Sequence, residues 1–180
     1  MVAEMVRSRA VKPMARHSTF RVSVSKDDLV FSSAHFITYA GSECEGLHGH
    51  NYRVRATVDG TLEPVDHLVF DVLELKRIMR QLCRELDHVV LLPSSSRRIQ
   101  VTEGPGTVTV AVDGVVRYQL PRRDCVLLPV PNTTVEMLAE LLATRLRAAL
   151  DSAQARGITA IEMEVEESFG QSAVCRFPVP

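Results

Sequence analysis

Residues 44–52 read CEGLHGHNY, a stretch in which His48 and His50 are separated by a single residue. Apolar and polar residues then alternate as far as an Asp-Gly pair at residues 59–60, which favours a tight turn. This pattern predicts one long strand that begins near His48. Side chains two residues apart on a strand project from the same face, so the two histidines can hold one ion together.

A third histidine, His35, lies upstream in the apolar stretch FSSAHF, residues 31–36. Three imidazole ligands that leave one coordination position open are typical of a catalytic zinc centre, and nitrogen ligands favour zinc. We therefore predict that His35, His48 and His50 bind Zn2+. Cys44 lies nearby, and three roles are open to it: a base beside the metal, a fourth zinc ligand, or an inert small residue.

The composition indicates one domain. The chain has 180 residues, 46% of them hydrophobic and 24% charged, which is enough apolar material for a core. A formal net charge of -1 gives no bulk reason to expect binding to nucleic acid or to a membrane surface. Because no long apolar run and no signal-peptide pattern is present, a soluble cytoplasmic protein is expected. The four scattered cysteines form no CxxC pair and are expected to be reduced thiols.

The order of predicted elements favours an α+β fold. Residues 1–16 are interpreted as a basic, disordered leader and residues 17–180 as a single domain. The predicted strands cover 17–24, 29–37 (a continuation of the first or a separate strand), 48–60, 158–165 and 172–177. The predicted helices cover 72–86 and a stretch from about 135 to before Gly157, each opened by a capping box: Asp71 with Glu74, and Thr133 with Glu136.

The stretch at about 93–130 is predicted to form a β insertion with short strands over 99–102, 107–112 and 115–120. The remaining elements predict an antiparallel sheet with two helices on one face. Such a sheet leaves one face and its edges open, and oligomerisation is one way to protect them.

Further polar residues follow the predicted helices and strands. Asp87 and His88 come directly after the first helix, where a carboxylate can orient an imidazole that relays protons. Taken alone, the pair is more typical of a helix C-cap. Glu136 is interpreted mainly as a capping residue, and Glu167 as a solvated carboxylate after a strand.

Several short motifs, in this order, resemble the 6-pyruvoyltetrahydropterin synthase / 6-carboxytetrahydropterin synthase family. They are FSSAH at 31–35, CxxxHGHNY at 44–52, FD at 70–71 with LK at 75–76, LDH at 86–88, TxE at 134–136 and VEES at 165–168. The set covers residues 31–168 and is far more specific than a lone HxH pair.

The resemblance implies the tunnelling fold (T-fold), in which a four-stranded antiparallel sheet carries two helices on one side. It implies that three copies close into a barrel and that two trimers stack as a hexamer, with active sites completed across subunit boundaries. The implied site residues are His35, His48 and His50 for zinc, Cys44, Asp87 and His88 for catalysis, and Glu167, Thr134 and Glu136 for the pterin.

The implied substrate is 7,8-dihydroneopterin triphosphate. Loss of triphosphate alone would give the 6-pyruvoyl product. Side-chain cleavage, with release of acetaldehyde and triphosphate, would give 6-carboxy-5,6,7,8-tetrahydropterin on the route to queuosine and other deazapurines, and we expect this second outcome.

Two alternatives belong to the same resemblance. Relatives that make an aldolase-like cut tend to carry Glu at the position of Cys44, so the cysteine argues against that reaction. A non-catalytic zinc-binding oligomer is opposed by the retention of every implied catalytic residue.

The stretch 93–130 is longer than is usual in the family, which leaves substrate preference open. Its arginines, which we interpret as solvated surface rather than triphosphate ligands, are Arg97, Arg98, Arg122 and Arg123.

Overall fold

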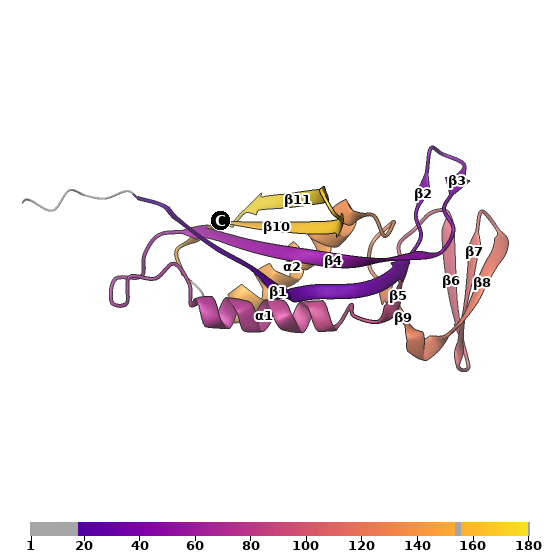
Figure 1. The fold of residues 1–180 in the computed structure, drawn as a ribbon, viewed down its shortest axis with the longest axis horizontal. Helices are drawn as coiled ribbons and strands as arrows, with labels where there is room; N and C mark the ends of the chain where they lie inside the picture. Colours follow the sequence, from indigo (N-terminus) through magenta and orange to yellow (C-terminus); the bar gives the residue numbers. More distant parts are fainter. Residues whose placement is uncertain (1–17, 154–155, 180) are drawn as a thin grey trace, which may run out of the picture.

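The computed structural model describes residues 18–153 and 156–179, so the predicted leader lies outside the described residues. Strands β1 (Phe20–His35) and β4 (His48–Gly60) form the centre of the main sheet and carry the three predicted ligands (Figure 1). They pair antiparallel and end with His35 opposite His48. The strands predicted over 17–24 and 29–37 are one strand, whose register shifts between Ser25 and Val30.

The main sheet has the strand order β11-β10-β4-β1-β5-β9. The added strands are β10 (Ile158–Ser168), β11 (Gln171–Pro178), β5 (Val89–Pro93) and β9 (Cys125–Leu128). The predicted four-stranded antiparallel unit is β11-β10-β4-β1. Strands β5 and β9 extend it beside β1 in parallel pairing. They are short apolar runs without alternation, and such runs give no clear periodic signal.

Two helices, α1 (Val72–Arg84) and α2 (Val135–Ser152), lie on one face of this sheet (Figure 1). Asp71 caps α1 by accepting a hydrogen bond from the backbone N–H of Leu73, as predicted, but Glu74 pairs with Arg77 instead of closing a capping box.

The N-cap of α2 is Thr134, not Thr133, and its hydroxyl accepts from the N–H of Met137 at 3.4 Å. Thr133 is fully buried, and its hydroxyl donates to the carbonyl of Phe36 at 2.8 Å instead. A buried hydroxyl must find a hydrogen-bond partner, and the carbonyl of Phe36 is the partner that Thr133 uses here, while Thr134 caps the helix.

The main core fills the space between the helices and the sheet. It includes the alternate residues of β4 that the sequence pattern predicted, namely Tyr52, Val54, Ala56 and Val58. The opposite face of the sheet carries ion pairs such as Arg55 with Glu164 at 3.5 Å and Arg53 with Glu166 at 3.9 Å.

A separate three-stranded sheet lies within the stretch 93–130, at the end of the molecule where β1 ends and β4 begins (Figure 1). Its strands are β6 (Ile99–Gly104), β7 (Thr107–Val112) and β8 (Val115–Pro121), followed by a short 3-10 turn, Arg122–Asp124. A two-stranded hairpin of β2 (Thr38–Tyr39) and β3 (Glu43–Cys44) stands beside it. No helix among the described residues is long and apolar enough to cross a membrane.

Candidate active site

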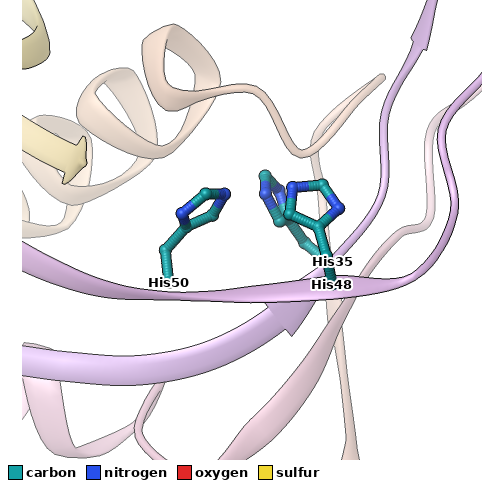
Figure 2. Close-up of side chains that lie close together, drawn as sticks. All are labelled: His35, His48 and His50. Carbon is teal, nitrogen blue, oxygen red and sulfur yellow. The ribbon is translucent and has the colours of Figure 1, made fainter.

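The rings of His35, His48 and His50 gather on one side of the main sheet (Figure 2). The ring centroids lie 4.8 to 5.2 Å apart, and one candidate ligand atom from each ring lies within 4.8 Å of the other two. The antiparallel register explains this arrangement, because it sets His35 directly opposite His48 and alternation adds His50 on the same face. The predicted grouping of these three histidines is therefore present.

Oxygen partners orient the three rings. The Nδ1 of His35 lies 2.8 Å from the carbonyl oxygen of Thr133, and the Nδ1 of His48 lies 2.9 Å from the carbonyl of Gly46. A carbonyl can only accept, so both rings carry a proton on Nδ1, and in the neutral tautomer this leaves the lone pair on Nε2. The Nδ1 of His50 lies 3.3 Å from the hydroxyl of Ser168.

The Nε2 atom of His35 is the strongest indication that the cluster binds a ligand. It is buried and has no hydrogen-bond partner, a condition shared among the described buried side chains only by the hydroxyl of Tyr52. The pKa of His35 is lowered to about 4, and burial of the ring is the main cause. The hydrogen bond to Thr133 raises this pKa, whereas the neighbouring His48 and His50 lower it further. The ring is therefore neutral near pH 7, which is the form that binds a metal. The cluster can hold one metal ion.

These rings line part of a cavity of about 420 Å3. The residues that line it are His35, Ile37, Glu45, His48, His50, Thr134, Val135, Glu136, Glu167 and Gln171. The three residues implied for pterin binding, Glu167, Thr134 and Glu136, thus face the same space as the histidines. Burial and the nearby Glu167 carboxylate both raise the pKa of Tyr52, whose ring packs against His35 and His50.

Cys44 is not among the residues that line this cavity. It is half-buried, its thiol contacts the carbonyl of Glu45 at 3.4 Å, and it packs beside the small sheet. Its sulfur is also absent from the described group of candidate metal ligands. Glu45 lies in the cavity instead, with a carboxylate oxygen 3.8 Å from Nε2 of His48. No sequence pattern favours Glu45 over its neighbours, since it is one carboxylate in a charged stretch.

Asp87 and His88 lie past the end of α1, whose C-cap is Glu85, so the interpretation as a helix C-cap does not hold. Asp87 accepts from the N–H of Ser32 at 2.8 Å and lies 2.9 Å from Nδ1 of His88. The bond from Ser32 is the main reason that the pKa of Asp87 lies below its ordinary value. The carboxylate therefore holds the imidazole in one orientation, while its part in proton relay stays a prediction.

Within one chain, however, His88 does not reach the histidine cavity. It is 82% exposed and borders a second hollow, which it shares with Ser32, Gly49, Asn51 and His50. His50 is thus the one member of the histidine cluster that lines both spaces. Its backbone is left-handed, with φ 57°. Strained residues of this kind gather at functional sites.

Asn132 and Thr133 join the three-histidine cluster to the start of α2, and no sequence pattern predicted this role for either residue. The amide of Asn132 donates to the carbonyl of Thr38 at 2.8 Å, and its oxygen accepts from the N–H of Thr38. Thr133 bonds Phe36 through its hydroxyl and His35 through its carbonyl. These contacts depend on partners distant in sequence, so no local pattern could have revealed them.

We expect Thr133→Val to weaken both the fold and metal binding. The change keeps the shape but removes the donor to Phe36, which should cost about 1–3 kcal/mol of unfolding free energy. Moving the carbonyl that orients His35 should lower metal affinity by about 10-fold. Chemical denaturation and a metal titration measure the two effects. Thr159→Val, at an exposed strand position, is the control and should change stability by less than about 0.5 kcal/mol.

Comparison with known proteins agrees with this fold and site. Among solved structures, 6-pyruvoyl tetrahydropterin synthase of Plasmodium falciparum superimposes with a TM-score of 0.83 at 31% identity, covering 90% of this chain and 99% of that one. The Plasmodium vivax protein in a form with its catalytic glutamate replaced by alanine gives the same TM-score at 27% identity and the same coverage. The chain is thus an α+β protein of the T-fold class.

The family follows from the sequence matches. The model of the family 6-pyruvoyl tetrahydropterin synthase matches residues 23–177. A Methanocaldococcus jannaschii protein, whose inferred name is 6-carboxy-5,6,7,8-tetrahydropterin synthase, is 32% identical over 148 residues, which are 82% of this chain and 90% of that protein. A Pyrococcus abyssi protein of the same inferred name is 34% identical over 118 residues, 64% of this chain and 68% of that protein. This chain belongs to the 6-pyruvoyl tetrahydropterin synthase family.

Proposed function

We propose that this protein is a zinc-dependent lyase that converts 7,8-dihydroneopterin triphosphate to 6-carboxy-5,6,7,8-tetrahydropterin, with release of acetaldehyde and triphosphate. The observation that carries the proposal is the orphaned, buried Nε2 of His35, which faces two further imidazoles at the edge of a cavity that also holds Glu167. The inferred names of the archaeal relatives support the choice of product.

Three imidazoles that leave a coordination position open fit zinc in its catalytic form. When bound, Zn2+ would act as a Lewis acid that stabilises negative charge on the oxygens of the substrate side chain. The residues Thr133 and Gly46 would keep the ligand rings of His35 and His48 in the required tautomer through their carbonyls.

Glu167 would fix the pterin ring. A carboxylate opposite two N–H donors makes a bidentate, charge-assisted contact, which matches the guanidine-like edge of a pterin. Thr134 and Glu136 border the same space at the start of α2, and Gln171 adds an amide to the lining. The ring would lie against Glu167 while the side chain reaches the histidines.

Cys44 and the Asp87–His88 pair would move protons on the substrate side chain. Asp87 holds the imidazole of His88 in one orientation, but within one chain that imidazole borders a second hollow and is not among the residues that line the cavity with Glu167. We therefore propose a homo-oligomer, a trimer or hexamer, in which a neighbouring subunit brings His88 to the site.

The test of this function is to incubate the zinc-loaded protein with 7,8-dihydroneopterin triphosphate and to identify the products by mass. Acetaldehyde together with 6-carboxytetrahydropterin is the expected result. A 6-pyruvoyl product would support triphosphate elimination instead. Absence of turnover with this substrate and with its pyruvoyl derivative would refute the lyase and favour a non-catalytic metal-binding oligomer.

A second candidate reaction is favoured by the position of Glu45. This carboxylate, rather than Cys44, lines the cavity beside His48, and the Plasmodium vivax neighbour has a catalytic glutamate. A carboxylate base that removes a side-chain hydroxyl proton would permit an aldolase-like cleavage of the same carbon chain. The mass of the pterin product distinguishes the two reactions.

We expect Glu167→Gln to impair substrate binding more than any other step. Loss of a charge-assisted contact worth about 1.5–3 kcal/mol should lower kcat/KM by about 10- to 100-fold, mostly through KM. Steady-state kinetics measures this split. Glu164→Gln is the control, because Glu164 pairs with Arg55 outside the residues that line the cavity. A change in kcat alone would indicate instead that Glu167 takes part in the chemical step.

A further inference from the structure

The segment from Glu43 to Leu47, here called the 43–47 segment, carries Cys44 and Glu45 and leads directly into His48. Its own pairing is slight. Strand β3 pairs only with β2, residues 45–47 belong to no strand, and the N–H of Glu45 donates to the carbonyl of Ile37. A segment with so few backbone partners needs other contacts to hold one conformation.

Side chains from the small sheet supply those contacts. The Nη1 of Arg98 donates to the carbonyl of Glu43 at 3.2 Å, and the Nη1 of Arg117 to the carbonyl of Cys44 at 3.5 Å. The N–H of Leu47 donates to the hydroxyl of Tyr118 at 3.0 Å. Three backbone groups of the 43–47 segment are thus bonded to side chains at or within the β6–β8 sheet.

The bonding side chains are themselves fixed. The guanidinium of Arg98 contacts both carboxylate oxygens of Asp113, with Nη2 2.7 Å from one of them, and only 21% of its side chain is exposed. The ring of Tyr118 packs against Phe36 with 5.3 Å between centroids. The guanidinium of Arg117 lies over the Tyr118 ring at 5.8 Å.

The small sheet is also anchored to the main sheet through a second hydrophobic core. That core combines residues of the main body with residues of the insertion, and Cys44 packs against it. Its buried members are Phe36, Leu92, Ile99, Val108, Val110, Val112 and Cys125. Because β1 ends at His35 and Phe36 follows it, the core connects the insertion to the strand that carries a metal-site histidine.

We propose that the β6–β8 sheet is a platform that fixes the 43–47 segment relative to the three histidines, with Arg98 and Tyr118 as positioning residues for the reaction. The inference rests on the proposed function for its catalytic part, and it assigns the insertion a role in placing the base, whether Cys44 or Glu45. A segment held at three backbone points keeps its side chains, including the Glu45 carboxylate beside His48, in one position, and small misplacements are costly.

The test uses the full-length, zinc-loaded protein with Tyr118→Phe and Arg98→Met. Tyr118→Phe keeps the ring against Phe36 and removes only the acceptor for Leu47, so kcat should fall about 3- to 10-fold with KM unchanged. Arg98→Met should lower kcat about 10-fold or more, and Arg98→Lys should restore part of it. Hydrogen exchange of amides in the 43–47 segment should become faster in both variants while zinc content stays at the wild-type level.

Two controls match these variants. Gln119→Ala changes an exposed neighbour of Tyr118 on β8, and Arg77→Met removes a guanidinium whose carboxylate partner, Glu74, lies on α1. Unchanged exchange and unchanged kcat in Tyr118→Phe and Arg98→Met would overturn the platform. If the wild-type protein fails to turn over the pterin, the proposed function fails separately. Faster exchange confined to the two platform variants would still support the fixing of the segment.

Discussion

The variant His50→Ala should lose its bound metal and nearly all turnover. His50 supplies one of three imidazoles whose ligand atoms lie within 4.8 Å of one another, and two ligands hold zinc far less tightly than three. Removing only an outer partner of a ligand costs 10- to 100-fold in affinity, so losing the ligand itself should cost roughly a thousand-fold or more. Elemental analysis after gel filtration and steady-state kinetics measure the two losses.

The control for this variant is His67→Ala. His67 is an exposed histidine in the loop between β4 and α1, outside the described group of candidate ligands, and its removal should leave both metal content and turnover unchanged. Full zinc content in His50→Ala would contradict the site. In the wild-type protein, metal binding should be lost as the pH falls through about 4, because the buried His35 imidazole takes up a proton there and can no longer bind a metal.

The grouping of the three histidines could be predicted from sequence because it depends on strand geometry. The i, i+2 spacing of His48 and His50 places both rings on one face, whatever the rest of the fold does. The position of His35 required one further step, the antiparallel pairing of β1 with β4, and that pairing is what sets it opposite His48. Alternation also predicted the buried residues of β4.

The remaining features depend on contacts between distant parts of the chain. Thr133 and Thr134 are equally good N-cap residues by type, and they differ in the fold because the Thr133 hydroxyl bonds the distant carbonyl of Phe36 while Thr134 accepts from Met137. The short strands β5 and β9 are defined by their neighbours rather than by a pattern of their own. The hydrogen bonds between the 43–47 segment and the side chains of Arg98 and Tyr118 likewise join residues that are distant in sequence.

Glu45 shows why residue type and spacing alone do not assign a base. Cys44 and Glu45 are neighbours, so their side chains diverge wherever the backbone is extended. The structure turns the thiol toward the second core and the carboxylate toward His48. The residue that the family motif implies for catalysis and the residue that lines the cavity are therefore different ones.

Cys44→Ala should keep the metal and the oligomer but lose about 100- to 10,000-fold in kcat, the range expected for removal of a general acid or base. The metal should stay because the sulfur of Cys44 is outside the described group of candidate ligands. Single-turnover kinetics with product identification measures the loss, and elemental analysis checks the metal. Cys175→Ala, at a half-buried position on β11, is the control.

The paired variant Glu45→Gln decides which of the two neighbours moves the proton. It removes the basic carboxylate beside His48 but keeps the size of the side chain. If Cys44→Ala loses turnover while Glu45→Gln keeps most of it, the thiol must reach the substrate in the working site, despite its position beside the second core. If the losses are reversed, the carboxylate is the base, and the aldolase-like product should be the one that disappears. Loss of zinc in Cys44→Ala would instead show that the thiol of Cys44 is a zinc ligand.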